Sequence, residues 1–414
     1  LAPWFSNSRR SLRDAGPYFD LVIEGPNDEP MEASALLERL RVAPRLWLQG
    51  RAGMGKSATF QAWERAYYLG HSSLHSAVRS FGFILVTIQV RQVANLPFDA
   101  TQPDVWLIQA VAHRFRQGGF DFSDTSLVVA LLKSGQLAIA LDGLNEADRD
   151  QAVLFFARVF PQTRILATSQ NNPSFEFQLW RLPNHISDNA EALLQLWLGD
   201  KRANDLLERL LNTGLLSELQ SGYDLRLIAD LAREDPQNAP LPQSRIDLYR
   251  AVLARADLQS SGAFDRLKKI AWSIFVEGRR DIGADEIKAM GHVVFEDMEK
   301  DGVRIVRPVG SGYEFRHDQM RAFLAALYLI EDSPNAKALA SRLTDSPVWR
   351  CTRRDQEELW QFFSEMLSLS AEIELIWQFT LSTPERAFLQ TALFLRAKAL
   401  GFSLTTSIDT SVLA

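Results

Sequence analysis

A cluster of small residues around one lysine is the stretch of this sequence best suited to chemistry. Gly50, Gly55, Lys56 and Ser57 fit the spacing G-x-x-x-x-G-K-[ST]. Glycines let the backbone curl until successive N–H groups point at one phosphate, and a following helix presents its positive end to the same anion. Lys56, the only lysine among the first 132 residues, would reach the β- and γ-phosphates, and the Ser57 hydroxyl would bind Mg²⁺.

The flanks of this cluster separate a phosphate loop from the simpler alternative, a plain glycine turn between a strand and a helix. An apolar run precedes the glycines and a helical pattern follows them, which is the context that a phosphate loop requires. We therefore predict that the whole turn and the start of the helix contact a nucleotide, through Gly50, Arg51, Ala52, Gly53, Met54, Gly55, Lys56, Ser57 and Ala58.

A second group of chemically capable residues lies in "QLAIALDGLNEA", where an apolar strand ends in Asp142 and Glu146 follows four residues later. A phosphate loop needs a carboxylate from a neighbouring strand to hold the metal and its water shell. The alternative is that Asp142 caps a turn and Glu146 is a solvated surface acid. Because a phosphate loop precedes them, we predict that Ser57 and Asp142 hold Mg²⁺. We also predict catalytic roles for Lys56, Asp142 and Glu146, and Glu146 is the group that would polarise the attacking water.

The base of the predicted nucleotide is adenine rather than guanine. Guanine-binding phosphate-loop proteins carry Asn or Thr directly before a lysine, and no lysine of this chain has either residue before it. The expected cofactors are therefore ATP or ADP together with Mg²⁺.

Short apolar strands that alternate with amphipathic helices in the first half predict a parallel α/β sheet. The strands are expected at 45–49, 81–90, 136–142, 163–169 and 177–182, and their continuous apolar character indicates burial on both faces. From 189–211 onward the pattern is helical. A proline-rich segment, 233–244, reads as a linker. Helices at 245–257, 263–277 and 284–290, a Gly-Ser-Gly hairpin and a further helix then outline a winged helix, and 334–400 is helical again.

Composition limits the partners and the compartment. The chain has 414 residues, a net charge of -6 and no cluster of basic residues, so we expect no direct contact with nucleic acid or with a membrane from this fragment. The single cysteine, Cys351, fits a reducing compartment. No apolar run approaches the length of about 18 residues that spans a bilayer. A cytoplasmic location is therefore expected.

The stretch "LDGLNEA" resembles the NACHT-type members of the STAND class of signal-transduction ATPases, and the resemblance extends over residues 40–335. "TRILATSQ" is similar to the family's sensor strand, "SRIDLYRAVLARA" to the helix that opens its winged helix, and "YEFRHDQMRAFLAALYL" to its histidine motif. The resemblance implies that His317 contacts the β-phosphate of bound ADP and that Gln170 faces the γ-phosphate. The competing interpretation of His317 is that it only caps the next helix or packs beneath the hairpin.

The resemblance also implies a domain order and a function. The expected fold class is an α/β P-loop NTPase followed by a helical domain, a winged helix and a second helical domain. Its expected bounds are 1–30 (lead-in helix), 31–183 (NTPase core), 184–235, 236–332 and 333–414. The expected function is an ADP-off, ATP-on signalling switch in innate immune or antiphage defence, which self-associates through its NTPase domain when ATP is bound. An effector domain before Leu1 and a sensor region after Ala414 would complete it.

Three positions depart from the family pattern. Asn145 replaces an aspartate, Gln170 replaces the sensor arginine, and Asp224 stands where a proline packs on adenine. Loss of the arginine removes charge that would stabilise the transition state, so hydrolysis is expected to be slow. Two alternatives stay open: an oligomeric ATPase that is constitutively active, with Glu146 as its base, or a scaffold that holds nucleotide without hydrolysing it.

Overall fold

A computed structural model of the chain divides into two compact units. Unit 1 comprises Leu1–Leu207 with Gln220–Gly222, and unit 2 comprises Glu208–Leu219 with Tyr223–Ala414. The residues that the structure describes are 1–13, 19–26, 29–51, 53–94, 96–120, 125–146, 150–173, 176–183, 186–234, 240–255, 262–279, 281–291, 295, 298, 305–309, 312–333, 335, 337–339, 343, 356–381 and 387–405. Cys351 lies outside these residues.

The sheet of unit 1 contains seven strands in the order β2-β1-β7-β3-β6-β5-β4. Five of them, β3 to β7, run parallel. On one side β1 and β2 continue the sheet, each antiparallel to its neighbour, and β1 pairs with β7. The predicted strands are therefore confirmed, but the sheet is mixed rather than parallel. The strand bounds are β1 (Val22–Glu24), β2 (Pro30–Glu32), β3 (Arg45–Gln49), β4 (Ile84–Gln89), β5 (Leu137–Asp142), β6 (Arg164–Ser169) and β7 (Gln178–Arg181).

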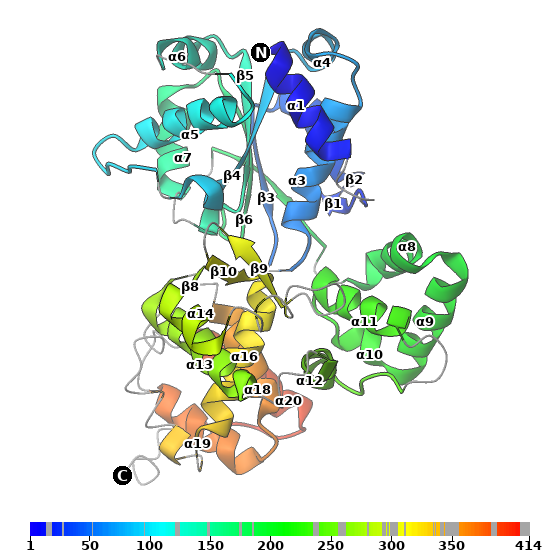
Figure 1. Cartoon of the computed structure of the whole chain (residues 1–414). Helices are drawn as coiled ribbons and strands as arrows, with labels where there is room; N and C mark the ends of the chain where they lie inside the picture. The colour runs from blue at the N-terminus through cyan, green and yellow to red at the C-terminus, as the bar shows by residue number, and fades with distance from the viewer. Residues whose placement is uncertain are drawn as a thin grey trace. The chain divides into compact units, whose positions relative to one another are not determined.

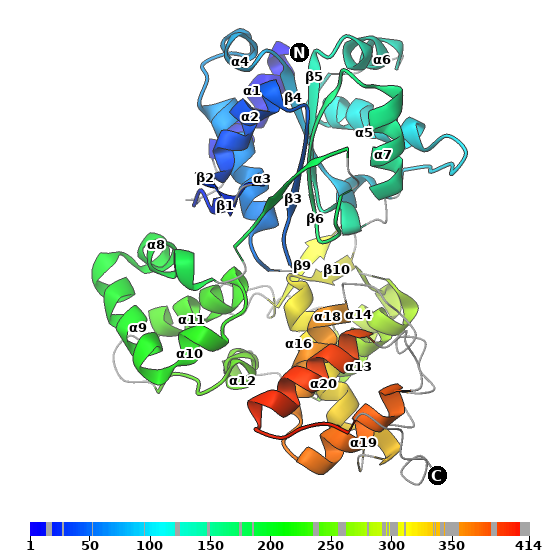
Figure 2. The same cartoon turned by 180° about the vertical axis from the view of Figure 1, so that it is seen from behind.

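Helices cover both faces of this sheet, with α1, α2 and α3 on one face and α5 and α7 on the other (Figures 1 and 2). This double cover explains why the central strands are apolar throughout. The helices are α1 (Ala2–Arg13), α2 (Leu36–Val42), α3 (Lys56–Glu64), α4 (Leu74–Phe81), α5 (Pro103–Gln117), α6 (Ser126–Lys133), α7 (Asp150–Val159) and α8 (Ser187–Leu198), with short turns η1 (Ala33–Ala35), η2 (Arg65–Leu69), η3 (Val90–Val93) and η4 (Leu144–Glu146).

The N-terminal helix α1 is part of the core of unit 1. Trp4 is fully buried and lies edge-on against Tyr68 and Phe115, with ring centroids 5.7 and 5.0 Å apart. A tryptophan in this setting buries on the order of 200 Å² of apolar surface. Residues 1–13 therefore pack as an element of the α/β fold.

The helical region predicted from 189–211 contains a break. Helix α8 ends before Gly199, whose φ of 77° is left-handed, and α9 (Asp200–Thr213) starts directly after it. Glycine adopts this conformation without a Cβ penalty. The apolar spacing runs through the break, so periodicity alone could not locate it.

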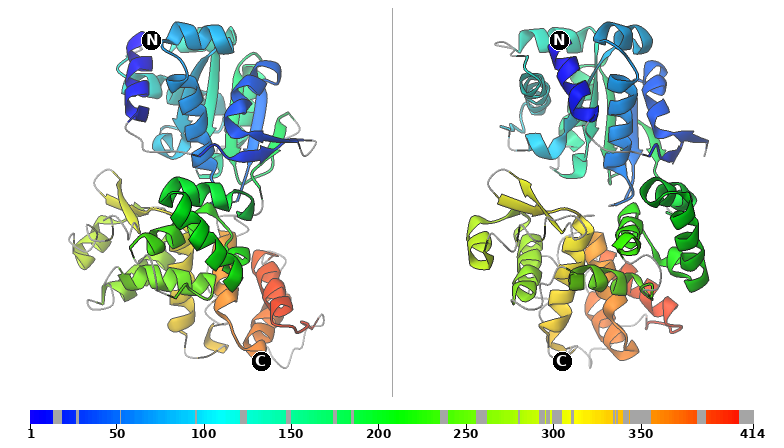
Figure 3. Two further views of the ribbon diagram at one scale, coloured as in Figure 1. Left: turned by 90° about the vertical axis from the view of Figure 1, so that its right-hand side faces the viewer. Right: turned by 45° about the vertical axis from the view of Figure 1, so that its right-hand side comes forward.

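Unit 2 is largely helical and carries a small antiparallel sheet in the order β8-β10-β9. The predicted hairpin is present as β9 and β10, drawn in yellow in Figure 3, and the predicted helices occur at α12, α13, α14 and α16. The winged-helix assignment itself stays a prediction. The bounds are α10 (Leu215–Glu218), α11 (Gly222–Glu234), α12 (Arg245–Arg255), α13 (Ala263–Glu277), β8 (Asp281–Ile282), α14 (Ala284–Met290), β9 (Val306–Val309), β10 (Gly312–Phe315), α16 (Asp318–Glu331), α18 (Glu357–Met366), α19 (Ser370–Leu381) and α20 (Ala387–Ala399).

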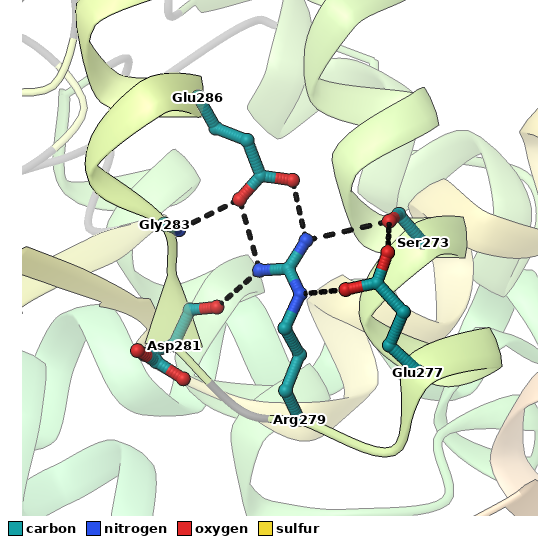
Figure 4. Close-up of polar contacts among 6 residues, drawn as sticks. All are labelled: Ser273, Glu277, Arg279, Asp281, Gly283 and Glu286. Atoms are coloured by element: carbon teal, nitrogen blue, oxygen red, sulfur yellow. Dashed lines mark hydrogen bonds and ion pairs between the residues drawn. The ribbon is translucent and has the colours of Figure 1, made fainter.

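Arg279 fixes the corner between α13, β8 and α14 (Figure 4). Its guanidinium donates to both carboxylate oxygens of Glu286, to Glu277 and to the backbone oxygen of Asp281. Glu286 also accepts the Gly283 N–H at 2.6 Å, which caps the first turn of α14. The edge strand β8, which residue patterns did not predict, is held in place by these contacts.

Among the described residues, no helix is both long enough and apolar enough to cross a membrane.

Candidate phosphate-binding site

The glycine-rich turn lies between β3 and α3, at the carboxyl edge of the parallel strands. Gln49, the last residue of β3, is in register with Ser169 of β6, and the Gly50 N–H donates to the Ser169 carbonyl at 3.1 Å. Gly53 and Gly55 have φ values of 73° and 103°. These left-handed residues curl the turn back before helix α3 begins at Lys56.

Lys56 lies across this turn. Its ammonium donates to the carbonyl oxygens of Gly50 and Arg51, both at 2.7 Å. An ammonium carries three donors, and these two bonds fix its positive charge over the turn. Within the described residues, no side chain caps the N-terminus of α3. The exposed ends of backbone N–H dipoles and the anchored charge together fit a phosphate group.

Asp142 closes the other side of the site. It is the last residue of β5, and β6 lies between this strand and β3. The Thr168 hydroxyl of β6 donates to Asp142 at 2.9 Å and accepts the Gly143 N–H at the same distance. Burial raises the pKa of Asp142, while hydrogen bonds from Thr168 and Ser57 and the charges of Lys56 and Arg91 lower it. The structure thus brings Lys56, Ser57 and Asp142 together, as the sequence predicts.

Thr168 and Arg91 are two site residues that residue patterns missed. Thr168 lies within the predicted strand 163–169, yet only the strand order shows that it stands beside Asp142. Arg91 follows β4 on η3, which contacts η4, and Gln89 is in register with Asp142. Only parallel pairing of β4 with β5 brings this arginine to the site, and pairing is not visible in a linear pattern.

The amide residues Asn145 and Gln170 are joined to each other. The Asn145 side-chain oxygen accepts the backbone N–H of Gln170 at 3.2 Å. Gln170 is 8% exposed, and its carbonyl accepts a hydrogen bond from Gln49 at 3.3 Å. These contacts connect the loops after β5 and β6. Positions 145 and 170 therefore each carry an amide without formal charge.

The remaining predicted residues of the turn lie as follows. Met54 is buried, Arg51 and Ser57 are exposed, and Ala58 is half-buried on α3. Ala52 lies outside the described residues. The backbone of Glu146 ends η4, and the structure describes nothing of its side chain.

The donor set beside the turn fits Mg²⁺. Ser57 and Asp142 offer hydroxyl and carboxylate oxygens, the hard ligands that this ion prefers, and Mg²⁺ keeps several waters and binds mainly through phosphates. In the described part of the chain, no group of three or more His, Cys, Asp or Glu side chains could hold a metal on its own. When bound with nucleotide, the ion would neutralise phosphate charge.

Gly55 offers a direct test of the shape of the turn. A Cβ at this position would lie 2.4 Å from Leu21 Cδ1, in addition to the strain of a φ of 103°. We expect Gly55→Ala to destabilise unit 1 by about 1–3 kcal/mol and to abolish nucleotide binding. Gly82→Ala is the matched control, because Gly82 has a φ of 81° and open space around its Cβ position. Denaturant unfolding and ADP titration measure both effects. Equal losses of ADP affinity in the two variants would contradict the expectation.

His317 lies in unit 2, at the residue before helix α16. It occupies the N-cap position with extended backbone, but its side chain makes no capping hydrogen bond. The capping interpretation of this residue is therefore wrong. Burial, followed by the charge of Arg316, lowers the pKa of His317 to about 4, and Asp318 opposes this in part. Contact of His317 with a nucleotide stays a prediction.

Asp224 belongs to a buried ionic cluster of unit 2. Its carboxylate accepts hydrogen bonds from Arg245 at 3.1 Å and from the Tyr249 hydroxyl at 2.7 Å, and Arg245 also donates to Glu358 at 3.0 Å. Burial alone would lower the pKa of Arg245, but Asp224 and Glu358 raise it above its ordinary value. Asp224, through Arg245, thus joins α11 to α12 and α18.

Glu365 gives this cluster a dependence on pH. Burial raises its pKa to about 7, against the lowering effect of Arg245. The folded state therefore keeps a proton that the unfolded state has lost. The resulting stability is present below about pH 4.5 and is lost as the pH rises through 7, by up to about 3 kcal/mol. Urea unfolding across this range should show a flatter profile in Glu365→Gln. Glu208→Gln, at an exposed site on α9, should keep the wild-type profile, and a slope shared by all three proteins would refute the assignment.

Comparisons with known proteins place the chain near no family at the sequence level. No family model matches it, and no curated protein matches it. Among solved structures it is similar to AMPPCP-bound DnaA from Aquifex aeolicus, at 10% identity and a TM-score of 0.33, over 89% of this chain and 91% of that one. It is also similar to Drosophila ORC bound to GC-rich DNA and Cdc6, at 10% identity and a TM-score of 0.27. That match covers 97% of this chain and 66% of the other.

Proposed function

We propose that this chain binds ATP and ADP and acts as a nucleotide-controlled switch of the NACHT-type STAND class. The observation that supports the proposal most strongly is the turn at 50–57, where Lys56 is anchored by two carbonyls beside Asp142. In the proposed cycle, ADP holds the protein closed and monomeric through the turn and His317. Exchange for ATP with Mg²⁺ releases His317 and exposes the NTPase core, 31–183, for self-association. A ligand shifts such an equilibrium only by its difference in affinity for the two states.

The chemistry assigned to each residue follows from its position. Backbone N–H groups of the turn and the Lys56 ammonium bind the phosphates. Ser57 and Asp142 would hold Mg²⁺, which supplies neutralisation of phosphate charge. Glu146 would orient and deprotonate the attacking water. With an amide at Gln170, little positive charge opposes the transition state, so turnover is slow.

The role in innate immune or antiphage defence comes from the sequence resemblance alone. The same holds for an effector domain before Leu1, for a sensor region after Ala414 and for the cytoplasmic location. These assignments are proposals about the full-length protein.

A scaffold that keeps one nucleotide without hydrolysing it is the second candidate. The hydrogen bond between Asn145 and the Gln170 backbone favours it, because this contact uses Asn145 to join two loops. Both candidates require nucleotide binding, and they differ in whether the nucleotide exchanges.

The test of the switch combines nucleotide content with oligomeric state. The purified protein is denatured and its supernatant is resolved by ion exchange, and the native protein is sized with ADP and with ATP and Mg²⁺. We expect bound ADP, a monomer with ADP and a larger species with ATP. Nucleotide that cannot be exchanged would favour the scaffold. Steady-state turnover well above about 1 per second, abolished by Glu146→Gln, would favour a constitutively active ATPase.

A further inference from the structure

The imidazole of His317 packs face to face with the ring of Tyr223. The ring centroids are 3.8 Å apart and the planes are inclined by 28°. Tyr223 belongs to the first turn of α11, whereas His317 directly precedes α16. Both residues lie in unit 2. The stack therefore joins two helices that are separated by more than eighty residues of sequence.

Tyr223 is itself held on several sides. Its side chain is 7% exposed, and its ring meets Tyr249 edge-on at 6.2 Å. The next residue, Asp224, is fully buried and accepts hydrogen bonds from Arg245 and Tyr249. A charged group that is buried and paired in this way cannot shift without a large cost. The Tyr223 ring is therefore held in place by the buried neighbour Asp224, which fixes the backbone, and by the edge-on contact with Tyr249.

The stack determines what His317 can offer to a ligand. The ring is half-buried, and its lowered pKa keeps the imidazole neutral at neutral pH. A neutral imidazole carries one N–H donor and one acceptor. Its interaction with a phosphate is then a directional hydrogen bond, whose strength depends on how the ring is oriented.

We propose that Tyr223 is the positioning residue for His317, and that its ring face orients the imidazole so that one ring nitrogen is presented to the phosphates of a bound nucleoside diphosphate. The contact with nucleotide rests on the proposed function, whereas the orientation of the ring does not. Arg316 and Asp318, which flank the histidine, contribute charge, and Tyr223 contributes the surface that sets the plane.

Two substitutions of Tyr223 separate orientation from packing. Tyr223→Phe keeps the ring and removes a hydroxyl that has no hydrogen-bond partner among the described residues, so it should cost nothing. Tyr223→Leu keeps an apolar side chain but removes the flat ring that covers one face of the imidazole. Tyr249→Phe is the control for the surrounding cluster, because it loses the hydrogen bond to Asp224 and keeps both rings of the stack.

The test measures the His317 pKa by NMR in the nucleotide-free chain and the dissociation rate of fluorescent ADP. We expect Tyr223→Phe and Tyr249→Phe to match the wild-type protein within about twofold in dissociation rate and to keep the His317 pKa low. Because burial is the main cause of the lowered His317 pKa, we expect Tyr223→Leu, which uncovers one face of the imidazole to water, to raise that pKa toward its ordinary value of about 6.5. ADP should then dissociate about tenfold faster, as in His317→Ala, which corresponds to the loss of one hydrogen bond.

The outcomes distinguish the proposals. An unchanged His317 pKa in Tyr223→Leu would overturn the positioning role, whether or not nucleotide binds. If His317→Ala accelerates ADP release and Tyr223→Leu does not, the positioning role fails and the proposed function stands. A wild-type chain that binds no ADP would refute the proposed function and with it the phosphate contact, while the NMR measurement would still decide whether Tyr223 orients the ring.

Discussion

Replacing Lys56 with alanine should lower the affinity of the chain for ADP and ATP by about a hundredfold or more. The substitution removes the only ammonium anchored over the turn in the part of the chain that the structure describes, where it donates to the Gly50 and Arg51 carbonyls. Hydrogen bonds to charged groups contribute about 1.5–3 kcal/mol each. These carbonyls accept from two of the three donors of the ammonium, so we expect one bond from Lys56 to phosphate. Loss of that one bond, at about 3 kcal/mol, amounts to roughly two powers of ten in the dissociation constant.

The control for this experiment is Lys133→Ala. Lys133 is the next lysine in the sequence, also belongs to unit 1 and is exposed at the end of α6. Equilibrium titration with a fluorescent ADP analogue measures both variants, and thermal unfolding without nucleotide shows whether each retains its fold. If Lys56→Ala bound ADP as tightly as Lys133→Ala does, the proposed function would lose its basis.

Most of the α/β fold is predictable because buried parallel strands have a continuous apolar pattern. The five predicted strands are found as β3 to β7, with ends that differ by at most three residues. The antiparallel pair β1 and β2 was not predicted. Each has only three residues, and their exposed positions are Val22, Pro30 and Glu32. Strands this short give no periodicity that a sequence pattern could reveal. The proline of β2, which lies at the edge of the sheet, protects that edge from further pairing.

The candidate site likewise contains residues that the sequence identifies and residues that only the structure reveals. Gly50, Lys56 and Ser57 could be identified because phosphate binding demands these residue types at fixed spacing. Asp142 could be identified because it ends an apolar strand in a chain that carries such a turn. The partners that support them could not. Thr168 reaches Asp142 through strand order, and Tyr223 reaches His317 through tertiary packing. Neither contact has a sequence separation that a motif could encode.

The largest expected effect on stability is that of Arg245→Ala. Arg245 is 2% exposed, ion-paired with Asp224 and Glu358, and its guanidinium lies 4.0 Å from the centroid of the Phe362 ring. Breaking a buried pair by removing one partner costs about 3–5 kcal/mol, because it leaves carboxylates buried without a counter-charge. We expect a loss of that size in the free energy of unfolding of unit 2, measured by urea denaturation at pH 8.

Two comparisons show whether charge is the cause. Arg250→Ala, on the same helix and exposed, should stay within about 0.5 kcal/mol of the wild-type protein. At pH 5 the loss in Arg245→Ala should shrink, since the stranded carboxylates can take up protons. A loss that does not change with pH would indicate that packing against Phe362 dominates. Because Asp224, Arg245 and Glu358 belong to three of the predicted domains, a cooperative loss would also mean that these segments of unit 2 unfold together.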